Sequence, residues 1–304
     1  MDQSQSDAPI WRSMLFVPVN VPKYVDKAHL RGADGIILDL EDSIAPADKA
    51  AARGMIEAAA AVCGRDGADI LVRINRPIDL AVRDIEAVVS PCVAALLLPK
   101  IDSASHVRLL AELVDEVEAR RGMAHGHTRF VVMVETAAAF PRIWEIAAAH
   151  ARNVALNLGA EDFALSTGSQ PDPDVLLYPM QQAVLAACAA GISPCGVIGT
   201  VADYKDLEAY RETIRRSRRF GFQGASCIHP DIVPLLNEGF SPSAAELAGA
   251  RRVIAAYAKA QAEGRGSIEV DGKMIDVPVV ERARRLVNLA ERIEARKLRA
   301  SKAR

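Results

Sequence analysis

Residues 130–136 read Phe-Val-Val-Met-Val-Glu-Thr, an apolar run that ends in a carboxylate and a hydroxyl. Residues 36–38 (Ile-Ile-Leu) and 95–98 (Ala-Leu-Leu-Leu) are further runs without a polar interruption. A strand with one face in water alternates apolar and polar residues, whereas a continuous apolar run is typical of a strand that is covered on both faces. Such strands are usually parallel, so these stretches predict a parallel sheet covered by helices.

Outward from these stretches, short apolar runs alternate with longer helical patterns along most of the chain. In residues 103–121, apolar residues recur at three- and four-residue steps, as in an amphipathic helix. The predicted strands are Met14–Val19, Gly35–Leu40, Ile70–Asn75, Val93–Pro99, Phe130–Thr136, Val154–Leu158, Ser193–Ile198 and Ser226–His229. Eight strand–helix units within about 240 residues predict an α/β protein with a (β/α)8 TIM barrel, and an open doubly wound sheet is the alternative.

The length of 304 residues accommodates this barrel and a smaller appendage. We expect residues 1–10 to form a flexible tail and residues 11–240 to form the barrel. Residues 241–304 predict a helix, then a hairpin that turns at Asp271-Gly272, then a second helix. This extension is too small to fold alone, so we expect it to pack on the barrel or on a neighbouring subunit.

Charge, hydropathy and cysteine content argue against several classes of protein. Thirty-seven Lys and Arg against 39 Asp and Glu give a net charge of −2, so nucleic-acid binding is not expected. The longest uncharged run, residues 175–202, contains Pro, Gly and a Gln pair and predicts a buried helix and strand, not a membrane span. Five scattered cysteines favour reduced thiols, and the polar amino terminus does not resemble a secretory signal, so we expect a cytoplasmic protein.

Polar side chains follow most of the predicted strands at the point where each strand ends. In a parallel barrel the strand-to-helix loops converge at these carboxyl ends, where ligands bind. The residues in question are Asp39, Glu41, Asp42, Arg73, Asn75, Lys100, Glu135, Thr136, Glu161, Asp162 and His229. The pattern indicates a polar site at this end of the barrel, although a solvated rim would also place polar residues there.

Glu135 and Asp162 follow neighbouring strands at equivalent heights, so we expect their carboxylates to lie close together. At 4 Å they would repel by about 4 kcal/mol at an effective dielectric constant of 20, so a positive group should lie between them. Hard oxygen ligands without a cluster of His or Cys favour Mg²⁺ over zinc. The alternative is that each acid pairs with a nearby cation, for which Arg73 and Lys100 are candidates.

Arg73 lies within the apolar stretch Ile70-Leu71-Val72-Arg73-Ile74. A guanidinium on an otherwise buried strand requires a carboxylate or phosphate partner. That partner is either a substrate or one of the nearby acids Glu41 and Asp42.

Several short motifs match one known family in the same order. They are RSMLFVP (12–18), GADGIILDLEDS (32–43), VRIN (72–75), LPK (98–100), VET (134–136), LGAEDF (158–163), IHP (228–230), FSP (240–242) and GKMID (272–276). With these motifs the chain resembles the citrate lyase β-subunit and malyl-CoA lyase family of the HpcH/HpaI aldolase superfamily. The resemblance spans residues 11 to 280 and implies a magnesium-dependent TIM barrel that assembles as a homotrimer or a hexamer.

The resemblance also implies roles for individual residues. Glu135 and Asp162 would bind Mg²⁺, with Glu135 also facing the substrate, and Arg73 would clamp a substrate carboxylate or carbonyl oxygen. Asp39 and Glu41 would form a supporting acidic shell in the catalytic site. Asp276 would reach into the site of a neighbouring subunit as the acid–base group.

The activity implied is carbon–carbon cleavage of a 3-hydroxyacyl-CoA, of the malyl, citramalyl or citryl type, into a 2-oxo acid and an acyl-CoA. An acyl-carrier thioester is the other substrate form that the resemblance allows. Two further readings are an aldolase acting on a free 2-oxo acid and a barrel that binds acyl thioesters without turnover. Four positions depart from the family pattern, which often has Gly, Arg, Asp and Lys where this chain has Val19, Met180, Gly196 and Ala225.

Overall fold

The computed structural model describes residues 9–202 and 204–303. Contacts among the described residues divide the chain into two compact units, one that extends to Phe240 and one formed by Ser241–Lys302. Residues 1–8, most of the expected amino-terminal tail, lie outside the described residues.

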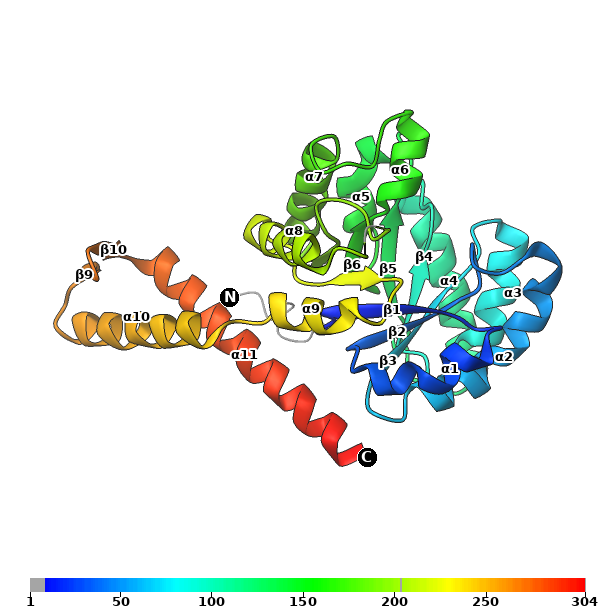
Figure 1. Ribbon diagram of the computed structural model, residues 1–304, viewed down its shortest axis with the longest axis horizontal. Helices are drawn as coiled ribbons and strands as arrows, with labels where there is room; N and C mark the ends of the chain where they lie inside the picture. The colour runs from blue at the N-terminus through cyan, green and yellow to red at the C-terminus, as the bar shows by residue number, and fades with distance from the viewer. Residues whose placement is uncertain (1–8, 203, 304) are drawn as a thin grey trace. The chain divides into compact units, whose positions relative to one another are not determined.

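Eight parallel strands form the sheet of the first unit, which confirms the predicted α/β barrel (Figure 1). The strands are β1 (Ser13–Pro18), β2 (Gly35–Asp39), β3 (Asp69–Arg73), β4 (Ala95–Leu98), β5 (Arg129–Val134), β6 (Asn153–Leu158), β7 (Ser193–Cys195) and β8 (Ala225–Cys227). Each strand pairs with the next in sequence from β1 to β7, and β1 also pairs with β8. A parallel bridge between Cys195 and Gly224 brings the two ends of the sheet together.

The continuous apolar runs arise because both faces of the strands are buried. Ile37, Leu71, Leu97 and Val131 belong to a cluster inside the barrel. Their neighbours along the strands, among them Leu38, belong to the larger core between strands and helices. Successive side chains of a strand point to opposite faces, so both alternating sets must be apolar when neither face meets water.

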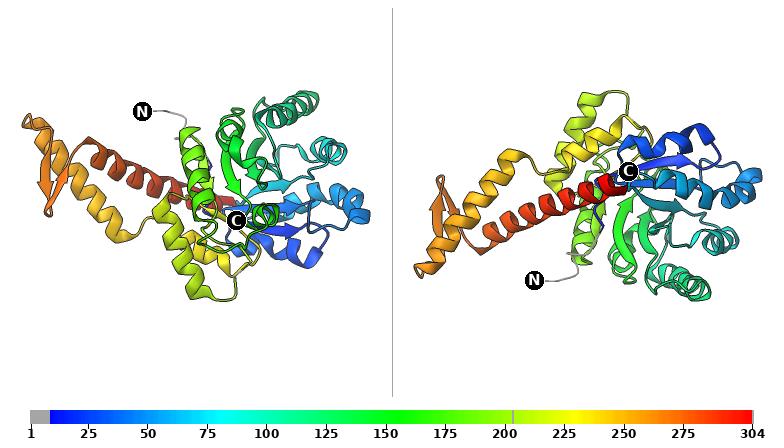
Figure 2. Two further views of the ribbon diagram at one scale, coloured as in Figure 1. Left: turned by 90° about the horizontal axis from the view of Figure 1, so that it is seen from above. Right: turned by 90° about the horizontal axis from the view of Figure 1, so that it is seen from below.

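Helices follow the strands and lie on the outside of the sheet (Figures 1 and 2). They are α1 (Pro22–Ala28), α2 (Lys49–Cys63), α3 (Ile78–Val88), α4 (Ala104–Arg120), α5 (Ile143–Ala147), α6 (Ala160–Thr167), α7 (Leu177–Ala189), α8 (Leu207–Phe220) and α9 (Ile232–Gly239). The helix expected over residues 103–121 is α4, and the Ser103 side chain caps it by accepting a hydrogen bond from the His106 backbone N–H. Val107, Leu110 and Val114 form its buried face.

The second unit contains the expected helix, hairpin and helix. Helix α10 (Ala244–Ala262) begins with a reciprocal capping box between Ser243 and Glu246. Strands β9 (Ile268–Val270) and β10 (Lys273–Ile275) pair antiparallel, and Asp271 and Gly272 turn between them with φ of 51° and 73°. Positive φ at both central residues is the requirement of a type I′ turn, which explains the Asp-Gly pair. Helix α11 (Val277–Ala303) follows.

Several strand bounds differ by one or two residues from the sequence-based expectations, and three differences concern the site. Strand β7 ends at Cys195, because Gly196 takes a φ of 142° that interrupts the extended chain. Strand β8 ends at Cys227, so His229 lies in the loop beyond it. Asp162 lies in the first turn of α6 and not at the end of a strand. Within the described part of the chain, no helix has the length and apolar character needed to span a membrane.

Candidate functional site

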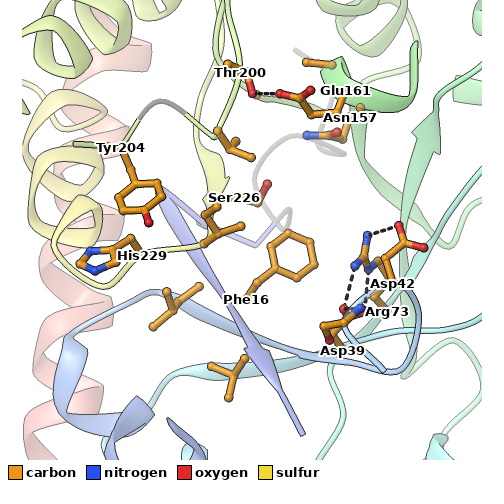
Figure 3. A pocket seen from close by; sticks show the side chains of 18 of the residues that line it. Phe16, Asp39, Asp42, Arg73, Asn157, Glu161, Thr200, Tyr204, Ser226 and His229 are labelled. Atoms are coloured by element: carbon orange, nitrogen blue, oxygen red, sulfur yellow. Dashed lines mark hydrogen bonds and ion pairs between the residues drawn. The ribbon is translucent and has the colours of Figure 1, made fainter. Parts of the chain in front are cut away.

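A cavity of about 660 Å³ opens at the carboxyl ends of the barrel strands. Asp39, Arg73 and Glu135 line it at or just beyond the ends of β2, β3 and β5. Asn157 from β6 and Ser226 from β8 complete its inner wall. Figure 3 shows these side chains, with the exception of Glu135, converging on one space. The position expected from the convergence of strand ends is therefore the position of this cavity.

Arg73 is held by acids from the end of β2 and the loop after it. Its Nε and one terminal nitrogen each donate to Asp39 at 2.7 Å, and its other terminal nitrogen lies 3.0 Å from Glu41 and 3.7 Å from Asp42 (Figure 3). The guanidinium also lies 4.8 Å from the centre of the Phe16 ring, a cation–π contact. The expected pairing with Glu41 and Asp42 is confirmed, and Asp39 is a closer partner that the sequence analysis did not name for Arg73. Arg73 also lines the cavity, and its contact with a substrate stays a prediction.

These contacts determine the charge states around Arg73. Burial alone would raise the pKa of Asp39, but the hydrogen bonds and charge of Arg73 outweigh burial and lower it. Burial raises the pKa of Glu41 against the opposing effect of Arg73 and Lys100. Burial disfavours the charged form of Arg73, yet its acidic neighbours raise its pKa above the ordinary value, so it stays cationic.

Lys100 connects four acids through its backbone and side chain, and one of them is Asp42, which lies 3.5 Å from the ammonium. Its backbone N–H donates to Glu135 at 2.6 Å, and its ammonium donates to Glu41 at 2.8 Å and lies 3.5 Å from Asp162. Its φ of 48° is in the left-handed region, which is uncommon for a residue other than glycine. Sequence reasoning placed Lys100 at a strand end and as a partner for the acids, but did not include it among the catalytic candidates.

Glu135 is almost fully buried, with 2% of its surface exposed. Burial raises its pKa to about 7; the Lys100 backbone N–H opposes this rise, and the charges of Glu41 and Asp162 add to it. Its carboxylate packs against Gly159, where an added Cβ would come within 2.4 Å of one carboxylate oxygen. Glycine at 159 thus makes room for Glu135 at the junction of β6 and α6.

The charges gathered here do not balance. Five carboxylates, Asp39, Glu41, Asp42, Glu135 and Asp162, stand against the cations Arg73 and Lys100, which gives −3 when all are ionised. No group of three or more Asp, Glu, His or Cys side chains among the described residues is arranged as a complete metal site. The donors suit a hard divalent cation that takes its remaining ligands from water or substrate, so the residues present fit Mg²⁺.

The opposite rim pairs two residues that the sequence indicated, Glu161 and His229, with two that it did not, Thr200 and Tyr204. Thr200, in the loop after β7, hydrogen-bonds Glu161 in the first turn of α6 (Figure 3). Tyr204 stacks on His229 with ring centres 4.8 Å apart and planes 7° apart. All four line the cavity. The positions of Glu161 and His229 just after strands were the sequence signals, whereas Thr200 and Tyr204 gave none because the loop after β7 has no regular pattern.

Asp276 precedes α11 in the second unit. Its carboxylate accepts a hydrogen bond from the Val279 backbone N–H at 3.4 Å, and its side chain is partly exposed. Its predicted role in a neighbouring subunit stays a prediction.

The four departures from the family pattern have identifiable environments. Val19, Met180 and Ala225 are buried, with 3% or less of their surface exposed. At Gly196 the φ of 142° would strain any other residue, and an added Cβ would lie 3.2 Å from the Phe222 ring. The backbone therefore explains the glycine at 196.

Fold and site together define a class of protein, a (β/α)8 barrel with an acidic, cation-accepting cavity at its catalytic end. The chain belongs to the HpcH/HpaI aldolase/citrate lyase family, whose sequence pattern matches residues 12–230. It is 34% identical to the citrate lyase subunit beta of Leuconostoc mesenteroides subsp. cremoris, over 92% of this chain and 93% of that protein. It is also 34% identical to the L-malyl-CoA/beta-methylmalyl-CoA lyase of Cereibacter sphaeroides, over 93% and 96% respectively.

Solved structures of similar proteins contain magnesium together with small acids. Protein CitE from Mycobacterium tuberculosis, in complex with magnesium, acetoacetate and coenzyme A, matches with a TM-score of 0.73 and 31% identity over 94% of this chain and 99% of that chain. The citrate lyase beta subunit from the same organism, complexed with oxaloacetate and magnesium, matches with a TM-score of 0.61 and 30% identity over 79% and 100%. The recognised resemblance is thereby confirmed.

Proposed function

We propose that this protein is a magnesium-dependent carbon–carbon lyase that cleaves a 3-hydroxyacyl-CoA of the malyl, citramalyl or citryl type into a 2-oxo acid and an acyl-CoA. The observation that carries the proposal is the excess of carboxylates around Arg73 and the buried Glu135 in one cavity at the catalytic end of the barrel. The relatives are named as a citrate lyase subunit and a malyl-CoA lyase, and these names support carbon–carbon cleavage as the reaction class.

Glu135 and Asp162 would hold Mg²⁺, which when bound polarises substrate oxygens and neutralises charge that develops on them. Binding would move the Lys100 ammonium away from Asp162, since both cations compete for the same carboxylate. Lys100 would keep its three other contacts, the backbone N–H to Glu135 and the ammonium to Glu41 and Asp42.

Arg73 would bind a carboxylate or carbonyl oxygen of the substrate. Asp39, Glu41 and Asp42 together contact all three nitrogens of the guanidinium through four oxygen atoms, and arginine has five N–H donors. Asp39, Glu41 and the Phe16 ring fix the orientation of the guanidinium at the cavity wall before substrate arrives.

Cleavage requires a base that takes the hydroxyl proton as the bond between the hydroxyl carbon and the carbon next to the thioester breaks. The electron pair of that bond passes to the thioester as an enolate, which takes up a proton to give the acyl-CoA. We assign the acid–base role to Asp276 of a neighbouring subunit in a homotrimer or hexamer. A positioned acid–base group typically contributes about 10² to 10⁴ in rate.

The test is turnover of malyl-, citramalyl-, methylmalyl- and citryl-CoA with Mg²⁺ by the wild type and by Glu135→Gln and Asp162→Asn. Both variants should lose at least about 10²-fold in kcat and retain the wild-type circular dichroism spectrum. Glu57→Gln, which changes an exposed acid on α2, is the matched control and should keep full activity. Unchanged turnover in the two cavity variants would refute the metal assignment. Cleavage of a free hydroxy acid, with no thioester cleaved, would instead support the aldolase reading.

A further inference from the structure

The ends of β2 and β3 are held from outside the cavity by two cations of α2. Lys49, the first residue of this helix, donates from its ammonium to the backbone carbonyl oxygens of Leu40 at 2.9 Å and of Glu41 at 2.8 Å. Arg53 lies one turn further on and donates from Nε to Asp84 of α3 at 2.8 Å. Neither cation lines the cavity, so neither is placed to contact a ligand there.

The Asp84 carboxylate connects Arg53 to the segment after β3. Its second oxygen accepts hydrogen bonds from the backbone N–H of Asn75 at 2.8 Å and from the Asn75 side chain at 2.7 Å. Asp84 has no exposed surface, and 2% of the surface of Asn75 is exposed. Arg73 lies two residues before Asn75, and its carbonyl oxygen accepts a hydrogen bond from the Leu40 backbone N–H at 3.0 Å. The backbone of Arg73 is thus fixed by Asn75 along the chain and by Leu40 on the neighbouring segment.

Stability alone does not explain where the two cations of α2 lie. The amino-terminal end of a helix carries partial positive charge, which favours acids there and disfavours cations. The first turn of α2 nevertheless contains Lys49 and no acid. A buried ion pair such as Arg53–Asp84 is on average weak support for stability, because the loss of hydration offsets the attraction of the charges. Positions that break a local rule are typical of functional sites, so these side chains indicate a role in arranging the cavity.

Three side chains form what we call the α2 brace: Lys49, Arg53 and Asp84. We propose that the α2 brace positions Arg73 to bind the carboxylate of a 2-oxo acid. This inference rests on the proposed function, in which Arg73 binds a carboxylate or carbonyl oxygen of the substrate. Glu41 lies 3.0 Å from the Arg73 guanidinium, so a shift of the Glu41 backbone would turn the guanidinium. The α2 brace therefore acts on the substrate through Arg73 and does not contact it.

The experiment measures binding of pyruvate to the full-length protein by calorimetry in the presence of Mg²⁺, without any thioester or turnover. Lys49→Met keeps an apolar stem and removes the ammonium, and Asp84→Asn removes the carboxylate charge. Each variant should weaken pyruvate binding about 10-fold, because the guanidinium is no longer held in place. Lys49→Arg restores a cation with several donors and should bind pyruvate within about 3-fold of the wild type. Arg65→Met, which removes an exposed cation just beyond the other end of α2, is the matched control and should bind pyruvate as the wild type does.

Urea unfolding of each variant separates positioning from a purely structural role. Wild-type pyruvate affinity in either Lys49→Met or Asp84→Asn, whatever the stability of that variant, would overturn the inference. Failure of Lys49→Arg to restore affinity, or a wild type that does not bind pyruvate, would also overturn it. Pyruvate binding that depends on the α2 brace, in a protein that cleaves no thioester, would leave the inference standing and refute the lyase. Thioester cleavage with wild-type kcat and KM in Lys49→Met would leave the lyase standing and refute the inference.

Discussion

Glu135 shows how one residue can report on the whole site. It is a carboxyl group with a single backbone donor, enclosed by the barrel and close to two other acids. A carboxylate in such a place is costly unless a cation neutralises it. A proton and a metal ion would therefore compete for the carboxylate oxygen atoms of Glu135.

Stability should consequently depend on pH. Burial raises the pKa of Glu135 to about 7 from the ordinary value of 4.5, so between these pH values the folded state holds a proton that the unfolded state has released. Folding then takes up a proton, and the free energy of unfolding falls as pH rises through this window. In metal-free buffer, the melting temperature of the wild type should fall from pH 5 to pH 8 relative to that of Glu135→Gln.

Mg²⁺ should reverse this trend, because it binds the ionised carboxylate. Its stabilising effect on the wild type should be larger at pH 8 than at pH 5.5 and absent in Glu135→Gln. Melting curves of the two proteins that stay parallel across the pH range would show that Glu135 is not the responsible group.

At the level of elements, the junction of β6 and α6 is the most demanding position in the site. It places Asp162 in the first turn of a helix while Gly159 leaves space for Glu135 from the neighbouring strand. Gly159→Ala would put its Cβ within 2.4 Å of a Glu135 oxygen, so that side chain must move. We expect at least about a tenfold loss of Mg²⁺ affinity and of kcat, since small misplacements at a site are costly.

Gly54→Ala provides the comparison, because position 54 lies within α2 and has open space around it. That variant should keep full activity and gain roughly 0.5 to 1 kcal/mol in stability, since alanine is a better helix former. Calorimetric Mg²⁺ titration and denaturant unfolding separate the two effects. Wild-type Mg²⁺ affinity in Gly159→Ala would contradict the packing argument.

Sequence alone could predict the strands because each carries its own signal. The runs at Ile36-Ile37-Leu38 and Val131-Val132-Met133-Val134 are apolar on both alternating faces, and the structure buries both. The Asp271-Gly272 turn was readable for the same reason, since its backbone angles restrict the residue type. The strand ends also located the cavity.

Other parts of the site depend on contacts between distant segments. Lys100 contacts the acids through both its backbone N–H and its ammonium. Its backbone has a left-handed φ, which a lysine in the sequence does not predict. The Thr200–Glu161 and Tyr204–His229 pairs join loops that are well separated in sequence. Likewise the charge states of Asp39 and Glu41 depend on which of them Arg73 contacts more closely.

At the scale of the whole molecule, the assignment of Asp276 makes a prediction about assembly. If each site takes Asp276 from another subunit, Asp276→Asn and Glu135→Gln damage different components of one site. Each variant alone should be inactive, and oligomers formed by co-refolding the two should regain a measurable part of the wild-type kcat. Steady-state assays of the mixtures check this.

A mixture of Glu135→Gln with Asp162→Asn is the control for that experiment. Both residues belong to the same cavity of one chain, so every cavity in the mixture still lacks one of the two carboxylates. This mixture should stay inactive. Recovery in the control, or none in the Asp276 mixture, would contradict a site that is shared between subunits.

The closure of the barrel has a mechanical consequence. Strands β7 and β8 are three residues long, and a lone bridge from Cys195 to Gly224 joins them. The barrel should open locally between β7 and β8, where pairing is weakest. Amide hydrogens of these two strands should therefore exchange with deuterium before those of the central strands. A circular permutation that places the new chain ends in the connection between β7 and β8 would leave the pairing of the other neighbouring strands intact.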